Sequence, residues 1–570
     1  MKRREFVHYG AAGLCAVPML ASMAFYSPTQ AGKKPDWLLT LIKGNDNQLD
    51  RLREYRVSDP KNPAYGGYVD GAEIPNPHST VAYIRTAGCA LASPESRYHR
   101  SDAIAKELEE ALRYLLKIQH ADGTIDLLST NFHSTPDTGF IVKWLVPVYT
   151  IVRREEGTRY DAQLELLKTF LQRAGEALAV GGIHTPNHRW VVSAALTKLN
   201  EVWPDPRYVA RINEWLGEHI DMDTDGQYDE KSTLIYSPLT DRVLITIAKG
   251  MNKPELYEYV RRNLMMTTYY VHPNGEVATD ASGRQDKAAI GTMEGYYYPY
   301  RYLALKDQNG VFAAMCKKIE DTVLEKNVSQ LSYFLEDPTL WRELPKPTSL
   351  PTSYAKAFPY SGLVRIRRGN WDATIISKNP TWLTFHKGHA VLQGIRFSAS
   401  FFGKGQFQGT EIRQEGKEYI MEQKLEGPYY QPYPKDSIAP DGDWNKMPRS
   451  NRKQSEVQHL TSAVRTRETG NGMECDIEIT GTDGVPVSME LIFREGGAFK
   501  NVVPVTSEKG TYLLSTGETG TYTLQNDTLT FGPGLALHKG IQLRGALPRM
   551  SSPTVYLTGF TPFRHTLRLS

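Results

Sequence analysis

The chain is poor in cysteine, with four in 570 residues, at positions 15, 89, 316 and 475, and no two of them have C-x-x-C spacing. Thiolate zinc sites are built from closely spaced cysteines, so this spacing argues against such a site. Three of the cysteines lie beyond the N-terminal segment described below, far apart from one another. We therefore expect the fold to depend on its hydrophobic core and not on disulfide bonds.

An excess of charge of one sign is also missing. Lysine and arginine number 67 against 64 aspartate and glutamate residues, which gives a formal net charge of +3. Proteins that bind nucleic acid usually carry a basic surface, so we expect no nucleic acid partner, although a local basic pocket stays open. Beyond the N-terminal segment no apolar run approaches the roughly 20 residues of a membrane-spanning helix, and we expect no membrane span.

The first 31 residues have the pattern of a signal peptide. They begin with the basic stretch MKRREF, continue with a short apolar run and end in small residues suited to cleavage after Ala31. The RREFV stretch resembles a twin-arginine signal, which implies export to the periplasm. Leu14 is too large for the usual lipoprotein motif before Cys15, so a lipid anchor is the less favoured interpretation.

The rest of the chain divides into two patterns. Residues 32–345 carry helical periodicity, as in SDAIAKELEEALRYLLKIQH, with apolar residues three and four positions apart. Residues 346–353 are rich in proline and serine and predict a linker. Residues 354–570 alternate polar and apolar residues between turn residues, which predicts an antiparallel β-sandwich domain. The expected fold class is therefore multidomain, with α and β domains.

The helical part repeats. The segments TPDTGF, TPNHRW and SPLTDR place prolines at positions 136, 186 and 238, so that the spacings are 50 and 52 residues. A weaker copy has Pro77, and another helix start is due near residue 293. A repeat of this length corresponds to one helical hairpin, which buries its apolar face only against its neighbours. Stacked hairpins predict an α/α toroid, either incomplete or a six-hairpin barrel.

One repeat start, GGIHTPNHRW, is unusually polar. Thr185 is a good N-cap and Pro186 suits the first helical position, so Asn187 and His188 are expected in a first turn that attracts anions. Equivalent helices of a toroid start at the same end, and their first turns are expected to converge on one cleft. The candidate substrate-binding residues there are Asn131, His133, His184, Arg189, Trp190, Arg242 and Arg284. For any one of them, a purely structural role at a helix start stays open.

Such a cleft favours one kind of chemistry. Helix starts with Asn, His and Arg side chains favour a carboxylate, and the 32 tyrosines suit contacts with sugars. In a uronic acid, the proton next to the carboxylate can be removed once the carboxylate is neutralised, and the glycosidic oxygen is then expelled by β-elimination. The reaction needs a neutralising group, a base and an acid.

The chain also resembles a known family. A toroid followed by an antiparallel β domain, with an Asn-His pair in TPNHRW and a tyrosine about one repeat later in TLIYSPLTDR, resembles the polysaccharide lyases of the heparinase II/III and alginate lyase type. Among related folds, the chain also resembles a smaller group, the lyases that remove rhamnose from glucuronate. The resemblance to the heparinase II/III and alginate lyase type implies that His188 and Tyr236 transfer protons, that Asn187 helps to bind the uronate carboxylate, and that His386 of the β domain touches the substrate. The expected partner is a uronate-containing oligo- or polysaccharide, and no cofactor is expected.

Two other functions stay open. A glycoside hydrolase on the same toroid would use two carboxylic acids across the bond, and the candidates are Asp137, Asp241, Asp280 and Glu230. A non-catalytic glycan-binding protein would need aromatic and hydrogen-bonding groups but no base. The products formed from candidate glycans distinguish these functions from a lyase.

Two segments have weak metal-site patterns, and no metal is expected at either. The acidic loop DMDTDGQYDEKS places Asp221, Asp223 and Asp225 at alternate positions, but it lacks the complete loop of an EF-hand, so a solvated turn is favoured. The H-x-x-H pair His386 and His389 is a weak metal signal in a β domain. The Gly-rich segment YYVHPNGEVATDASGRQDK adds further residues that could line the cleft.

Overall fold

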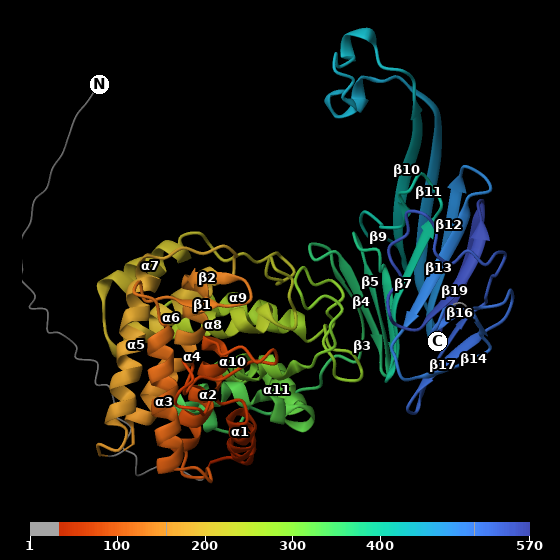
Figure 1. Cartoon of the computed structure of the whole chain (residues 1–570). Helices are drawn as coiled ribbons and strands as arrows, with labels where there is room; N and C mark the ends of the chain where they lie inside the picture. Colours follow the sequence, from red (N-terminus) through yellow and green to blue (C-terminus); the bar gives the residue numbers. More distant parts are fainter. Residues whose placement is uncertain (1–33, 156, 507) are drawn as a thin grey trace, which may run out of the picture.

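A computed structural model describes residues 34–155, 157–506 and 508–570. The predicted signal peptide, residues 1–31, lies outside the described residues. The chain forms a helical domain followed by a β domain, and the two lie side by side with strands of the β domain facing the helices (Figure 1). Within the described residues, no helix has the length and apolar character needed to span a membrane.

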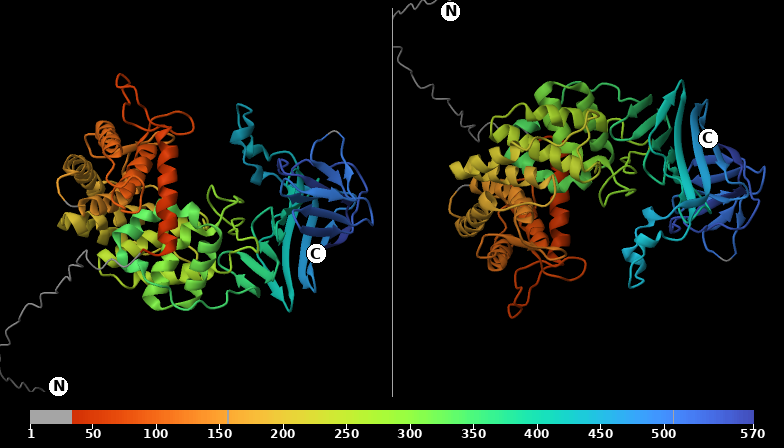
Figure 2. Two further views of the ribbon diagram at one scale, coloured as in Figure 1. Left: turned by 90° about the horizontal axis from the view of Figure 1, so that it is seen from below. Right: turned by 90° about the horizontal axis from the view of Figure 1, so that it is seen from above.

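The helical domain is built from hairpins of one inner and one outer helix. The inner helices are α2 (Pro77–Leu91), α4 (Thr135–Arg153), α6 (His188–Val202), α8 (Tyr236–Gly250), α10 (Tyr297–Asp307) and α12 (Leu331–Glu336). The outer helices are α1 (Asp36–Arg53), α3 (Asp102–Ile118), α5 (Asp161–Val180), α7 (Pro206–Leu216), α9 (Leu256–Thr267) and α11 (Gly310–Thr322). Each inner helix from α2 to α10 contacts the next, and α12 packs on α2 and α4. Figure 2 shows the hairpins following one another around a curve, which confirms the predicted α/α toroid.

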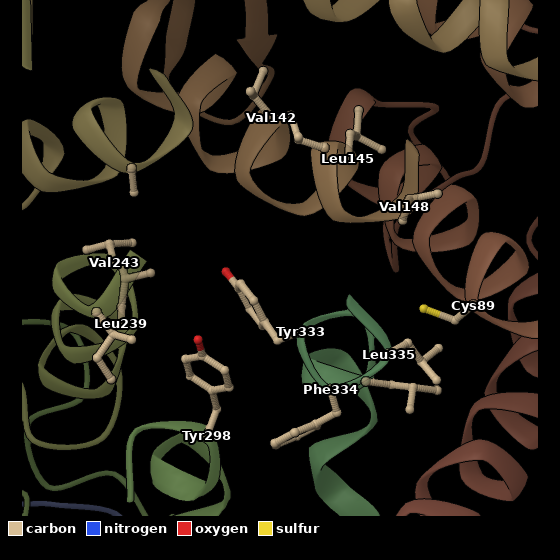
Figure 3. Close-up of a cluster of buried hydrophobic side chains, with 14 of the residues drawn as sticks. Cys89, Val142, Leu145, Val148, Leu239, Val243, Tyr298, Tyr333, Phe334 and Leu335 are labelled. Atoms are coloured by element: carbon tan, nitrogen blue, oxygen red, sulfur yellow. The ribbon is translucent and has the colours of Figure 1, made fainter. Parts of the chain in front are cut away.

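Apolar side chains of the inner helices meet in one core. Val142 and Leu145 of α4, Leu239 of α8 and Tyr298 of α10 come together there with residues of α12 (Figure 3). The ring of Tyr298 lies 4.9 Å from that of Tyr333 on α12, and Figure 3 shows both hydroxyl groups pointing the same way. Other elements cover α4 and α6 on nearly all sides, and the sequences of both helices are accordingly apolar around most of the helix circumference.

The repeat prolines mark the starts of the inner helices, with one difference in register. Pro77 and Pro136 lie in the first two positions of α2 and α4, and Pro238 is the third residue of α8. Pro186 instead lies two residues before α6, so Thr185 does not cap that helix. The difference comes from a contact distant in the sequence. The carboxylate of Glu230, 43 residues further along the chain, accepts a hydrogen bond from the backbone N–H of Asn187 at 3.3 Å.

The β domain is a sandwich of two sheets that share one hydrophobic core. One sheet has the order β14 (Ala498–Lys500), β17 (Gly520–Leu524), β18 (Asp527–Gly532), β20 (Phe563–Leu569), β12 (Gly472–Gly481), β11 (Gln454–Thr469), β10 (Glu418–Tyr430) and β9 (Arg413–Glu415). The other has the order β15 (Val503–Pro504), β16 (Thr511–Leu513), β19 (Thr554–Phe560), β13 (Pro486–Phe493), β7 (Ala390–Ala399), β6 (Leu383–Lys387), β5 (Trp371–Ile376), β4 (Leu363–Arg368) and β3 (Ser353–Phe358), with β8 (Gly405–Gln406) on β7. The pairing is antiparallel as predicted, except that β16 runs parallel to β19. Between these two strands the chain crosses to the other sheet, and such a crossover allows a parallel pair.

Polar contacts join the two domains. Asp225 of the helical domain accepts the backbone N–H of Ser361 at 2.8 Å, and Asp223 accepts the Ser361 hydroxyl at 3.2 Å. Arg494 of the β domain forms two hydrogen bonds, of 2.7 and 2.8 Å, with Glu276. The acidic loop that contains Asp223 and Asp225 is therefore not a solvated turn, because its carboxylates hold the β domain in place.

Candidate active site

The first turns of α2 and α4 meet through a carboxylate. His78 of α2 has its Nε2 atom 3.7 Å from Asp137 of α4. The Asp137 carboxylate also accepts the Ser134 hydroxyl at 2.6 Å and the side-chain amide of Asn131 at 3.0 Å. Asn131 comes from β2 (Asn131–Ser134), which pairs with β1 (Ile125–Leu127) in a hairpin before α4. The predicted residue Asn131 thus reaches the helix starts through Asp137.

The start of α6 is tied to the segment before α8. Asn187 donates its side-chain amide to Glu230 at 3.1 Å, in addition to the backbone bond described above. The Nε atom of Arg284 lies 3.7 Å from the same Glu230 carboxylate. Burial raises the pKa of Glu230 above its ordinary value, so this carboxyl group takes up a proton more readily than an exposed one. Three chemical groups therefore meet here: a carboxyl group that can donate a proton, an amide and a guanidinium.

His188 is the first residue of α6 and is 9 % exposed. Its ring lies edge-on to Phe140 of α4 at 5.8 Å and to His184 at 4.8 Å. In the described part of the chain, its Nδ1 atom has no hydrogen-bond partner. Burial lowers the pKa of His188 to about 4, and the positive potential of His184 and Arg284 adds to the shift. The imidazole is therefore neutral near pH 7 and can accept a proton.

Tyr236, the first residue of α8, completes the cluster. Gln285 donates its side-chain amide to the Tyr236 hydroxyl at 2.7 Å, and the guanidinium of Arg284 lies 5.2 Å from the centre of the Tyr236 ring. The loop that carries Arg284 and Gln285 is held by Asp286, which accepts the backbone N–H of Leu234 at 3.1 Å. Arg284 thus lies beside both Glu230 and Tyr236. The structure brings together the predicted residues Asn187, His188, His184, Tyr236 and Arg284.

Three cations lie deeper in the toroid. The ammonium group of Lys143 is 4.0 Å from the Trp144 ring, and the guanidinium of Arg85 is 4.8 Å from the same ring. Arg242 donates to the Gly295 carbonyl at 2.8 Å. Burial lowers the pKa of Lys143 well below its ordinary value, and the charges of Arg242 and Arg85 lower it further. Arg242 is therefore an interior residue next to other cations and not part of the first-turn cluster.

Three predicted substrate-binding residues lie elsewhere. Trp190 is 0 % exposed and donates its indole N–H to Asp221 at 3.0 Å, so it is a core residue. Arg189 stacks on Trp190 at 4.5 Å and donates to the same Asp221 at 3.0 Å. Both fix the loop before α8, because helix periodicity turns them away from the side that His188 occupies. His133 lies on the exposed hairpin, where it stacks on His120 at 3.7 Å.

His386 of β6 lies at the joint between the domains. Its ring is parallel to that of His272 at 3.7 Å, and His272 lies 2.9 Å from Asp372 of β5. One ligand atom from each of these three residues lies within 4.8 Å of the others, so the group could hold a metal ion. The buried, unpartnered Nδ1 of His386 fits a ligand, but Arg365 already bonds Asp372 at 2.6 Å and supplies the positive charge. His389 is not part of the group, because it binds Asp527 at 3.0 Å.

His78, Lys143 and Arg85 are not among the site residues predicted from the sequence. A signal for His78 exists in the repeat, since His78, Asp137 and Asn187 each directly follow a repeat proline. Aligning the weak copy at Pro77 in the same register would have placed His78 beside Asp137. Lys143 is buried on α4 and Arg85 is partly buried on α2, where a cation is rare, and the helix pattern alone carries no signal for them.

Solved structures with a similar fold are polysaccharide lyases. The first is heparinase III, with a TM-score of 0.55 at 10 % sequence identity over 95 % of this chain and 86 % of that chain. The second is the chondroitin AC lyase of Streptomyces coelicolor A3 in complex with chondroitin sulphate, with a TM-score of 0.55 at 12 % identity over 92 % and 79 %. A Paenibacillus xanthan lyase gives 0.54 at 10 % identity over 94 % of this chain and 57 % of that chain. The chain has the polysaccharide lyase fold.

This likeness is one of fold. No protein-family model and no curated protein matches the sequence. The comparison confirms the expected polysaccharide lyase fold, and the structure places Asn187 and His188 of TPNHRW and Tyr236 of TLIYSPLTDR at neighbouring helix starts.

Proposed function

We propose that the protein is a polysaccharide lyase that cleaves a glycosidic bond to a uronic acid by β-elimination. The observation that carries the proposal is the cluster of a neutral imidazole, a phenol and an amide at two helix starts, on His188, Tyr236 and Asn187, beside the loop guanidinium of Arg284. These are the groups that the elimination needs: a base, an acid and donors for a carboxylate. The fold shared with known polysaccharide lyases supports it.

Neutralisation of the uronate is the first requirement. Asn187 has a second amide hydrogen besides the one given to Glu230, and Arg284 carries a positive charge beside it. The start of α6 adds its helix dipole. Glu230, whose burial raises its pKa, can share a proton with the substrate carboxylate. Donors of this kind act most strongly in the enolate-like transition state, where negative charge on the carboxylate grows.

Proton transfer is the second requirement. His188 is uncharged near pH 7 because of its low pKa, so it is assigned the removal of the proton next to the carboxylate. A bound carboxylate would make the imidazole more basic when the substrate is present. Tyr236 is assigned the donation of a proton to the leaving oxygen, and Arg284 beside its ring stabilises the phenolate that forms.

The positive interior of the toroid supports an acidic substrate. Burial lowers the pKa of Lys143 and of Arg85, the charge of Arg242 lowers both further, and an anion above them relieves that repulsion. A narrower form of the proposal is a lyase that removes rhamnose from glucuronate. We further propose that the enzyme acts in the periplasm, after export by the signal in residues 1–31.

The test is an absorbance screen over uronate-containing glycans. Elimination leaves a double bond conjugated with the carboxylate, which absorbs in the ultraviolet, whereas hydrolysis leaves none. New reducing ends without absorbance would instead favour a glycoside hydrolase, in which the buried Glu230 serves as the acid. Binding without any product would favour the non-catalytic glycan-binding protein. Absorbance that disappears in His188→Ala supports the lyase.

A further inference from the structure

A second pocket lies between the domains, on the β-domain side of the loop that carries Arg284 and Gln285. Its volume is about 510 Å³, within the range of small-molecule sites. Residues of the helical domain, including Lys231 and Lys287, line one wall, and residues of β-domain loops, including Lys378 and Tyr360, line the other. Asn187, His188 and Tyr236 are not among its lining residues. The pocket is therefore distinct from the proposed reaction site.

The charge of the pocket is unbalanced. Three lysines, Lys231, Lys287 and Lys378, line it, and Glu411 is the one acidic residue among the lining residues. Across the described residues none of these lysines forms an ion pair or a side-chain hydrogen bond. Nearby lysines repel one another in free protein, so the pocket favours a ligand that brings negative charge.

Two further features suit a saccharide. Tyr360 is 64 % exposed at the pocket and offers an aromatic face of the kind on which sugar rings pack. Lys231 and Lys378 both adopt left-handed backbone conformations, with φ of 51° and 54°, which non-glycine residues adopt at a cost. Strained residues of this kind gather at functional sites, and here both direct a lysine to the same pocket.

The pocket is also connected to the proposed reaction site. Lys231 follows Glu230, which binds Asn187, and Lys287 follows Asp286, which fixes the loop that carries Arg284. One polysaccharide chain can therefore touch both sites. We propose that the pocket binds a second acidic sugar of the substrate, away from the bond that is cleaved. This inference rests on the proposed function for its substrate, and the ligand group is a carboxylate or a sulfate.

The test is a double variant, Lys287→Gln with Lys378→Gln, assayed on a cleaved polymer and on its shortest cleaved oligosaccharide. We expect KM for the polymer to rise about tenfold with kcat within about twofold, and no change for the oligosaccharide, which is too short to reach the pocket. The control is Lys417→Gln, an exposed lysine of the β domain outside the pocket. An unchanged polymer KM, or an equal rise in the control, would overturn the proposal.

A binding experiment tests the pocket independently of the proposed lyase activity. Calorimetry on the inactive His188→Ala protein, with and without the two lysine substitutions, uses a polyuronate oligosaccharide and a sulfated neutral oligosaccharide as probes. A tenfold weaker affinity for one probe in the lysine variant identifies its acidic group as the ligand. If no glycan is cleaved but this loss is seen, the lyase assignment fails and the pocket stands. If cleavage occurs and neither probe depends on the lysines, the pocket proposal fails alone.

Discussion

Two histidine clusters in this molecule have nearly the same composition and opposite electrostatics. At the helix starts, His188 is buried with its Nδ1 unpartnered and with His184 and Arg284 nearby. At the domain joint, His272 and His386 are equally buried, but they surround Asp372. The first cluster lacks a carboxylate bonded to its imidazole, and the second is built on one.

The difference separates a structural cluster from a reactive one. Burial alone would raise the pKa of Asp372, but Arg365 and His272 lower it well below its ordinary range, so the negative charge is balanced inside the protein. At the helix starts the Glu230 carboxylate lies 3.7 Å from Arg284, but in the described residues the Nδ1 atom of His188 has no hydrogen-bond partner. Buried polar groups are usually paired, so the buried, neutral imidazole of His188 with its unpartnered Nδ1 atom indicates a group that is available to a substrate.

The largest effect is expected at the helix starts. His188→Ala and Tyr236→Phe should each lower kcat/KM by about 10²–10⁴-fold, because general acid and base groups contribute that much. The melting temperature should change little, because Tyr236→Phe keeps the ring that packs against the apolar core and, in the described residues, the Nδ1 atom of His188 makes no hydrogen bond that alanine would lose. Steady-state kinetics with thermal unfolding in parallel measures both. Near-normal rates in both variants would remove these residues from the mechanism.

The domain joint should respond in the opposite way. Asp372→Ala leaves the buried guanidinium of Arg365 without its partner, and breaking such a pair costs about 3–5 kcal/mol of stability. His389→Ala is the matched control, because its ion pair with Asp527 is exposed and worth about 0–1 kcal/mol. Urea unfolding measures both. Equal, small losses in the two variants would mean that the Arg365–Asp372 pair adds little to stability. Activity per folded molecule should stay normal in either variant.

Much of the architecture is visible in the sequence, because the hairpin repeat and the change from helical to alternating periodicity are local patterns. The repeat prolines at 77, 136 and 238 lie at helix starts for that reason. The start of α6 is two residues later than its local signals indicate, because Glu230 caps it from a distant part of the chain. A contact of this kind has no local signature.

The site residues also differ in whether local sequence predicts them. Asn187, His188 and Tyr236 could be predicted because a motif and a repeat register point to them. Trp190 shares the motif with His188 but faces the core, where its indole N–H needs Asp221. The direction of a side chain depends on the packing partner, and the partner of Trp190 comes from the loop after α7.

A pH titration sharpens the comparison. We expect the imidazole of His188 in the free protein to titrate near pH 4, because burial first, and then His184 and Arg284, disfavour its charged form. Its contribution to stability is present above about pH 6.5, where the unfolded histidine is neutral, and is lost as the pH falls toward 4. NMR titration, with the signal assigned by its loss in His188→Ala, measures the value. A midpoint near 6.5 would show that the site is more open than the structure indicates.

The smallest effect on the chemistry is expected for His386→Ala. The family resemblance implies a histidine that touches the substrate, but His386 is 5 % exposed and its ring lies flat against that of His272. Burial, and then the charge of His272, lowers the pKa of His386 well below its ordinary value, so it adds no positive charge for an acidic sugar. We therefore expect kcat/KM per folded molecule within about twofold of wild type and a stability loss of about 1–3 kcal/mol, the usual range for a buried side chain. A large loss of kcat/KM at an unchanged melting temperature would instead show that the domain joint opens to form a wall of the cleft, and the two histidine clusters would then be one site.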